Sequence, residues 1–98
     1  MDPATVLAAL RDHEAELRAA GIVRLSLFGS TVRNEAGMDS DIDLLAAFDA
    51  GRPLSLLDVI GIECRLSDLL RRKVDLVEEG TLKPRVRRRV EPEIVRAF

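Results

Sequence analysis

The sequence of 98 residues has few of the residue types on which several common kinds of functional site depend. Its one cysteine, Cys64, excludes an internal disulfide and most cysteine-based zinc sites. Its three aromatic residues are all phenylalanine, which argues against the base-stacking surfaces of proteins that bind single-stranded nucleic acid. The only histidine, His13, is interpreted as a partly exposed helix residue, because no neighbour in the sequence would orient it for catalysis.

Membrane and targeting signals are also missing from the sequence. No apolar run approaches the roughly 20 residues of a membrane-spanning helix, and no basic segment followed by an apolar one stands at the N-terminus. The composition, 47% hydrophobic and 33% charged, is typical of a globular protein. We therefore expect a soluble, cytoplasmic protein in which residues 1–98 form a single domain.

The hydrophobic periodicity predicts helices that alternate with short strands. Strands are expected at residues 22–28, 41–48 and 73–77. Helices are expected at residues 3–20, at 55–72 and from 81 onward, with a short helical turn after the first strand. Ser55-x-x-Asp58, at the start of the second of these helices, resembles a capping box with Asp in place of the usual Glu. The predicted fold class is α/β (α+β): a small mixed sheet of about three strands, flanked by helices.

The same periodicity predicts which side chains are buried. The apolar face of the first strand should carry Val23, Leu25 and Leu27, and its other face should carry Arg24, Ser26 and Phe28. The apolar side of the second helix should consist of Leu56, Leu57, Ile60, Cys64, Leu66, Leu69 and Leu70. Cys64 is thereby predicted to be a small core residue, and Thr81 is predicted to cap the third helix.

Two acids, Asp41 and Asp43, open the second predicted strand. Side chains two residues apart in a strand point to the same face, about 6.5–7 Å from each other. Carboxylates placed in this way near a core are costly unless a cation holds them. Asp75, among the apolar residues of the third strand, can join them if the two strands are neighbours. Such hard oxygen ligands suit Mg²⁺, and a pair of these ions can stabilise an in-line phosphoryl displacement.

A tight turn, Gly29-Ser30, ends the first predicted strand. A glycine lets backbone N–H groups approach phosphate oxygens, and the Ser30 hydroxyl can donate as well. Arg33, one helical turn further on, could reach the same triphosphate. Each of these features alone is more often an ordinary solvated turn, so their combination and order carry the information.

The combined pattern resembles the polymerase-beta-like nucleotidyltransferases, and in particular their minimal branch, the MNT-domain proteins. The resemblance rests on Phe-Gly-Ser-x-x-Arg at residues 28–33, Ser-Asp-Ile-Asp-Leu-Leu at 40–45 and Val-Asp-Leu at 74–76. Leu-Lys-Pro at residues 82–84 is similar to the C-terminal helix of that branch, so the resemblance covers almost the whole chain. Asn34 departs from the glycine that the family often has after the arginine.

The resemblance implies a role for each residue of the pattern. The catalytic carboxylates that bind Mg²⁺ would be Asp41, Asp43 and Asp75, and the third would help to deprotonate the attacking hydroxyl. The nucleotide-binding residues would be Gly29, Ser30, Arg33 and Ser40. The departure at Asn34 could alter the backbone of the loop, but it removes no ligand.

The activity implied by the resemblance is transfer of AMP from ATP, with two Mg²⁺ ions and release of pyrophosphate. Because no second domain is expected here, the acceptor should be a protein partner. Minimal members often pair with a HEPN ribonuclease as a toxin–antitoxin system, in which the MNT antitoxin AMPylates a tyrosine of the toxin. Two alternatives remain open: an antitoxin that masks the toxin by stoichiometric binding, and transfer to a small molecule such as an aminoglycoside.

A basic segment, Arg85–Arg89, stands out in a chain whose formal net charge is −2. With Arg71–Lys73 it concentrates positive charge in the C-terminal part of the sequence. It is interpreted either as a solvated helix face or as a docking surface for an acidic partner or a nucleotide. Direct binding to nucleic acid is not expected, because aromatic residues are scarce.

Overall fold

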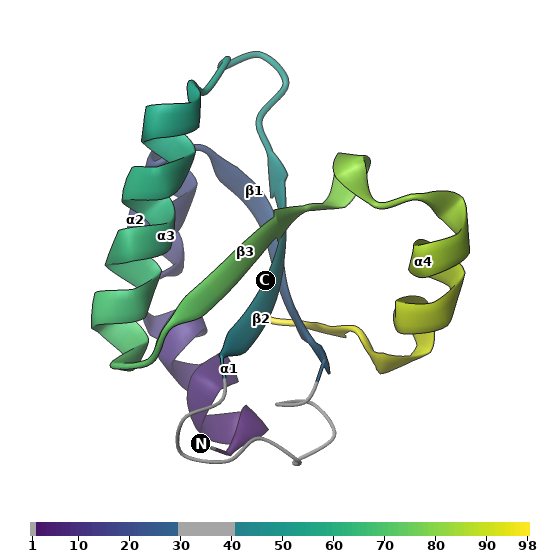
Figure 1. Cartoon of the computed structure of the whole chain (residues 1–98). Coiled ribbons are helices and arrows are strands. Elements are labelled where there is room, and N and C mark those ends of the chain that lie inside the picture. Colours follow the sequence, from purple (N-terminus) through teal and green to yellow (C-terminus); the bar gives the residue numbers. More distant parts are fainter. Residues whose placement is uncertain (1, 30–40) are drawn as a thin grey trace.

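A computed structural model describes residues 2–29 and 41–98 (Figure 1). Its helices are α1 (Pro3–Asp12), α2 (Glu14–Ala19), α3 (Leu56–Leu70) and α4 (Pro84–Val90), with short 3-10 helices η2 (Glu79–Thr81) and η3 (Glu91–Glu93). Its strands are β1 (Ile22–Phe28), β2 (Ile42–Phe48), β3 (Val74–Glu78) and β4 (Val95–Arg96). Within the described residues no helix is both long and apolar enough to cross a membrane.

The strands form one mixed sheet in the order β3-β2-β1-β4. β1 pairs antiparallel with β2 and β4, while β2 pairs parallel with β3 through the crossover helix α3. The predicted fold class is confirmed, but the sheet has a fourth strand that the sequence pattern does not predict. β4 has only two residues, and its conformation depends on pairing with β1, a tertiary contact that local periodicity cannot reveal.

The helices cover the two faces of the sheet unequally. α1, α2 and α3 lie over one face, and α4 lies beyond the other (Figure 1). The hydrophobic core is on the side of α1, α2 and α3, and its most deeply buried members include Val6, Leu10, Leu25, Leu27, Leu44 and Leu66. The opposite face of the sheet is therefore the one left available for polar side chains.

The first predicted helix is in fact two helices. Asp2 caps α1 by accepting a hydrogen bond of 3.3 Å from the N–H of Ala4. The helix is interrupted at His13, whose backbone is not helical and whose Nδ1 lies 3.0 Å from the carbonyl oxygen of Ala9. His13 is partly exposed, as predicted, but it lies between two helices and not within one. Gly21 follows α2 with a φ of +114°.

An irregularity near the start of β1 changes which residues it buries. The register with β2 shifts between Ile22 and Arg24, so Ile22 faces the core and Val23 is 41% exposed. The prediction that Val23 shares the buried face of Leu25 and Leu27 is therefore wrong. Regular alternation holds along the rest of the strand.

The start of α3 follows its sequence signals closely. Ser55 Oγ accepts a hydrogen bond of 3.1 Å from the N–H of Asp58, and the Asp58 carboxylate accepts one of 2.9 Å from the N–H of Ser55. This reciprocal pair is the predicted capping box. The helix ends at Leu70, two residues earlier than predicted, because Arg71 adopts a left-handed conformation.

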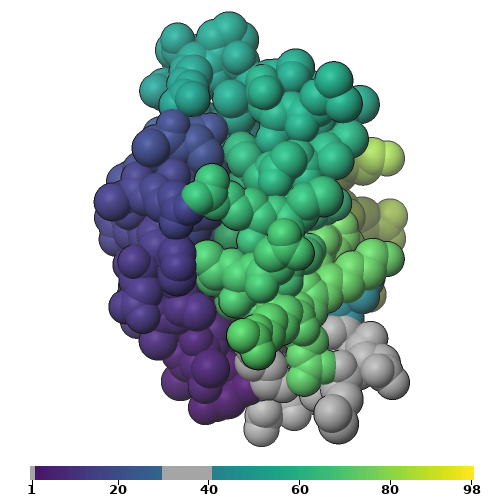
Figure 2. Space-filling model, turned by 90° about the vertical axis from the view of Figure 1, so that its left-hand side faces the viewer, coloured from purple at the N-terminus to yellow at the C-terminus, as the bar shows by residue number. Residues whose placement is uncertain are grey.

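The buried side of α3 differs from the predicted one. It consists of Ile62, Leu66 and Leu70. Four residues predicted for the core are exposed: Leu56, Leu57, Ile60 and Cys64. The helix carries two apolar stripes at four-residue spacing, and only the tertiary packing selects which one faces the sheet. Figure 2 shows this side of the molecule, where α3 lies at the surface beside α1 and α2.

The outer edge of β3 is capped by side chains of α3. The N–H of Val74 donates to Ser67 Oγ and the N–H of Leu76 donates to Glu63 Oε2, both at 3.0 Å. Backbone amides at a sheet edge are open to pairing with another strand unless they have partners. These two bonds therefore block strand addition at the positions that they occupy.

The segment after β3 departs from the predicted helix that Thr81 was expected to cap. Thr81 ends η2, and its hydroxyl donates to the carbonyl oxygen of Glu78 at 2.8 Å. α4 begins three residues later at Pro84, with Lys83 in the N-cap position. The prediction is wrong because the fixed φ of a proline suits the first position of a helix, which moves the start to Pro84.

Candidate active site

Asp43 and Asp75 lie directly opposite each other on parallel strands. The register pairs Asp43 of β2 with Asp75 of β3 on one side and with Phe28 of β1 on the other. Residues in register on adjacent strands share a face, and the strands are about 4.8 Å apart. Since Leu44 points into the core, this row lies on the opposite face, toward α4. The structure thus makes the second and third predicted strands neighbours, and it places two carboxylates side by side.

Asp41 lies just before β2 and has a cationic neighbour. Its Oδ2 is 3.8 Å from Nζ of Lys73, and the N–H of Ile42 donates to the carbonyl oxygen of Lys73 at 2.9 Å. Across residues 2–29 and 41–98, no three His, Cys, Asp or Glu side chains form a ready group of metal ligands. In the described conformation, Asp43 and Asp75 therefore lie next to each other, while Asp41 lies beside Lys73.

The end of β1 is shaped to admit the carboxylate of Asp43. Gly29 has a φ of +80°, in the left-handed region that side chains disfavour. A Cβ at this position would lie 3.2 Å from Cγ of Asp43 and still closer to its Oδ2. Only glycine therefore fits both the turn and the space beside this carboxylate.

Three predicted site residues, Ser30, Arg33 and Ser40, lie outside the described residues. The loop residue Asn34 is also outside them. Their proposed roles in nucleotide binding remain predictions from the sequence.

The donor set suits a hard cation such as Mg²⁺. Two adjacent carboxylates on one face provide charged oxygen ligands, and like charges so close are unfavourable without a cation. Mg²⁺ commonly takes one or two protein carboxylates and completes its shell with water and phosphate oxygens. Asp43 is partly buried and Asp75 is exposed, so further ligands could approach from solvent. The residues present thus fit a magnesium ion that a bound nucleotide helps to coordinate.

Comparison with known protein families identifies the family of this chain. Residues 10–96 match the nucleotidyltransferase domain family, and that span includes Gly29 and the three aspartates. The chain belongs to this family. The resemblance drawn from the sequence pattern is therefore confirmed.

Relatives of this nucleotidyltransferase are similar over most of their length. The protein adenylyltransferase MntA of Thermococcus cleftensis is 41% identical over 87 residues, which cover 88% of this chain and 86% of the relative. A solved structure assigned to a minimal nucleotidyltransferase is 45% identical, with a TM-score of 0.77 and coverage of 97% and 95%. A tri-AMPylated HEPN toxin of Shewanella oneidensis in complex with its MNT antitoxin matches at 18% identity, with a TM-score of 0.65 and coverage of 94% and 71%. At that identity the last match shows the fold alone.

A cleft of about 380 Å³ opens on the same face of the nucleotidyltransferase sheet, between the strands and α4. Its floor includes Ser26 of β1 and Leu45 of β2, which are register partners in the row next to Phe28 and Asp43. Arg96 of β4, the other register partner of Ser26, also lines the cleft. The sequence pattern had placed Ser26 on the polar face of β1, but it gave no sign that α4 would enclose this face.

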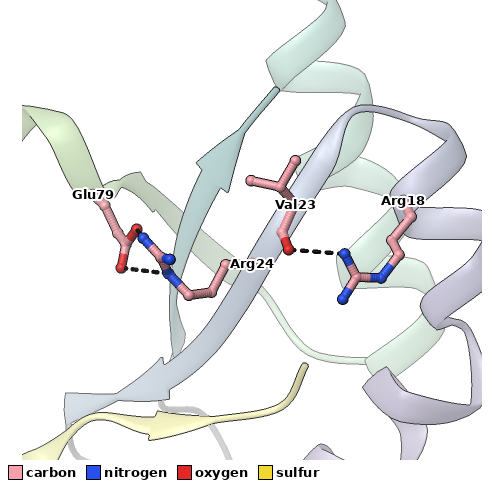
Figure 3. Close-up of polar contacts among 4 residues, drawn as sticks. All are labelled: Arg18, Val23, Arg24 and Glu79. Carbon is pink, nitrogen blue, oxygen red and sulfur yellow. Dashed lines mark hydrogen bonds and ion pairs between the residues drawn. The ribbon is translucent and has the colours of Figure 1, made fainter. Parts of the chain in front are cut away.

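An ion pair at one end of the cleft ties β1 to η2. Arg24 Nε lies 3.2 Å from both carboxylate oxygens of Glu79, and Arg24 Nη2 also contacts Glu79 Oε2 (Figure 3). The hydrogen bond to Glu79, and then the charge of that carboxylate, raise the pKa of Arg24 above its usual range. Beside it, Arg18 Nη1 donates to the carbonyl oxygen of Val23 at 2.9 Å. The sequence could not predict the ion pair, because its members are 55 residues apart.

Proposed function

We propose that the protein is a Mg²⁺-dependent protein adenylyltransferase that transfers AMP from ATP to a hydroxyl of a HEPN-type toxin and thereby acts as its antitoxin. The observation that carries the proposal is the row of Asp43 and Asp75 beside Gly29, two carboxylates next to a turn that only glycine fits. The name of the Thermococcus relative supports adenylyl transfer to a protein. The Shewanella complex, although it matches only in fold, supports a HEPN partner and a hetero-oligomer.

The chemistry assigns a part to each site residue. Gly29, Ser30, Arg33 and Ser40 would hold the triphosphate through backbone N–H groups, hydroxyls and a guanidinium. The metal-binding carboxylates would be Asp41, Asp43 and Asp75. Bound Mg²⁺, two ions when the nucleotide is present, would offset the negative charge of the phosphates.

The transfer itself is an in-line displacement at the α-phosphorus of ATP. The acceptor oxygen forms a bond to that phosphorus, and the bond from the phosphorus to the oxygen that bridges to the β-phosphate breaks. Pyrophosphate leaves with the electron pair of the broken bond. The proton of the acceptor hydroxyl passes to the carboxylate of Asp75, which lies opposite Asp43 in the sheet.

A labelling experiment tests the proposal. The protein is incubated with [α-³²P]ATP, MgCl₂ and the product of the adjacent gene, which the proposed function expects to be a HEPN-type toxin, and label on that product is measured. We expect transfer by the wild type, none after chelation of the metal, and none by Asp43→Asn. Asp68→Asn removes an exposed acid of α3, the helix that covers the opposite face of the sheet, and this variant should transfer normally.

Other outcomes would indicate the alternative functions. Neutralisation of the toxin without label, and unchanged by Asp43→Asn, would show an antitoxin that masks its partner by binding. Label on an aminoglycoside in the absence of any protein partner would show a small-molecule nucleotidyltransferase. Either result would overturn the proposed function.

A further inference from the structure

The cleft between α4 and the sheet contains a buried polar side chain that has no role in the nucleotidyltransferase site described above. Ser26 is 3% exposed and lines the cleft, and no residue in the described part of the chain hydrogen-bonds to its hydroxyl. A buried hydroxyl without a hydrogen-bond partner costs free energy, because it has lost its bonds to water. Such a group aimed into a cleft indicates that a ligand or partner supplies the missing hydrogen bond.

The charges around the cleft favour a negatively charged occupant. Three arginines line it against two glutamates, and Glu79 is already paired with Arg24. Arg87 of α4 and Arg96 of β4 have no acidic partner among the described residues. The remaining acid is Glu91, so the unpaired charge is positive. Leu45, Leu82 and Ile94 add an apolar surface.

The position of the cleft relative to the carboxylates identifies which reactant it can hold. Along β1, Gly29 lies on one side of the row formed by Phe28, Asp43 and Asp75, and Ser26 lies on the other. Successive same-face residues of a strand are about 6.5–7 Å apart, so the cleft begins one row away from the carboxylates. In an in-line displacement the attacking oxygen and the leaving pyrophosphate must be on opposite sides of the phosphorus. With the triphosphate at Gly29, the attacking group approaches from the side of the cleft.

We propose that this cleft is the acceptor site of the transfer. It holds an acidic segment of the partner protein that carries the attacking hydroxyl, with carboxylates of that segment paired to Arg87 and Arg96 and a polar group bonded to Ser26. The inference rests on the proposed function, since it assigns the second substrate of that same reaction. Among the basic residues of α4, Arg87 thus has a docking role on the side that faces the sheet.

Charge reversal of the two arginines tests the assignment. Arg87 and Arg96 are both exposed, so the fold should tolerate the substitutions Arg87→Glu and Arg96→Glu. Each variant is assayed with [α-³²P]ATP and the HEPN-type product, and binding of α,β-methylene ATP with MgCl₂ is measured by calorimetry. We expect kcat/KM for the protein acceptor to fall at least about tenfold through KM, with affinity for the nucleotide unchanged.

Two controls separate the cleft from general effects of charge. Arg88→Glu makes the same change on α4 at a position that does not line the cleft, and it should behave as the wild type. Arg96→Lys keeps the positive charge and should recover most of the activity lost in Arg96→Glu.

Each remaining outcome contradicts the inference in a recognisable way. Equal behaviour of Arg87→Glu, Arg96→Glu and Arg88→Glu would show that the cleft does not hold the acceptor, while the proposed function stands. Weakened nucleotide binding with an unchanged acceptor KM would assign the cleft to the nucleoside of ATP instead. No transfer by the wild type would overturn the proposed function, and this inference with it.

Discussion

Gly29 makes room for the carboxylate of Asp43. The two residues come from different strands, and a Cβ on Gly29 would lie 3.2 Å from Asp43 Cγ and 3.3 Å from its Cβ. Such distances are shorter than nearly all real contacts of this kind, so one of the two groups would have to move. The glycine that closes β1 and the acid on β2 are therefore one structural unit, although 14 positions separate them in the sequence.

The first prediction follows from this pair. Gly29→Ala should destabilise the fold by about 1–2 kcal/mol, because the left-handed backbone disfavours a side chain. It should also displace the Asp43 carboxylate and lower the rate of AMP transfer about 100-fold. Thermal unfolding and the labelling assay measure the two effects. Gly61→Ala is the matched control: a Cβ there meets no atom within 4 Å, and the helix should gain about 0.5–1 kcal/mol.

The second prediction concerns the two apolar stripes of α3. Leu66 is fully buried, so Leu66→Ala should lower the free energy of unfolding by about 2–5 kcal/mol. Leu57 is 78% exposed, so Leu57→Ala should change it by less than about 0.5 kcal/mol. Urea denaturation of the two variants measures the difference. A larger loss in Leu57→Ala than in Leu66→Ala would show that the helix is packed through the other stripe.

Cys64 gives a third prediction, which needs no substitution. The thiol is exposed on α3 and is the only one in the chain. A disulfide reagent that releases a coloured thiolate should therefore modify the native protein at a rate close to that of the urea-unfolded chain. Protection of the thiol until unfolding would instead place Cys64 in the core, as the periodicity of the sequence suggested.

The capping box of α3 gives a fourth prediction, on pH dependence. The backbone hydrogen bond from Ser55, followed by the bond with its side chain, lowers the pKa of Asp58 below its ordinary value of 3.8. A depressed pKa in the folded state means that the carboxylate stabilises the fold above pH 3.8 and loses this effect as the pH falls through the folded-state value. Asp58→Asn should thus lower the melting temperature at pH 7 and have a smaller effect at pH 3.

The control for this prediction is another acid on the same helix. Asp68→Asn removes an exposed carboxylate that has no part in the capping box. Its melting temperature should follow that of the wild type at both pH values. If Asp58→Asn showed the same difference from the wild type at pH 3 as at pH 7, the carboxylate charge would not be what stabilises the helix start.

Much of the fold could be predicted from local patterns, and the errors share one cause. β1, β2 and the capping box of α3 were predicted nearly to the residue, since alternation and capping are short-range effects. The errors at Val23, Cys64 and β4 all concern which surface meets another element. Local periodicity shows that a stripe is apolar, but it does not show what covers it.

The candidate site divides in the same way. The sequence by itself determined which residues belong to the candidate site, because few other kinds of site combine a glycine turn with spaced aspartates in that order. Only the tertiary structure decided that Asp75 lies opposite Asp43, that Asp41 lies beside Lys73, and that α4 encloses a basic cleft over Ser26. The physical reason is that pairing and enclosure depend on contacts between residues far apart in the chain. Their energies are set by the packing of whole elements, which no single segment of sequence contains.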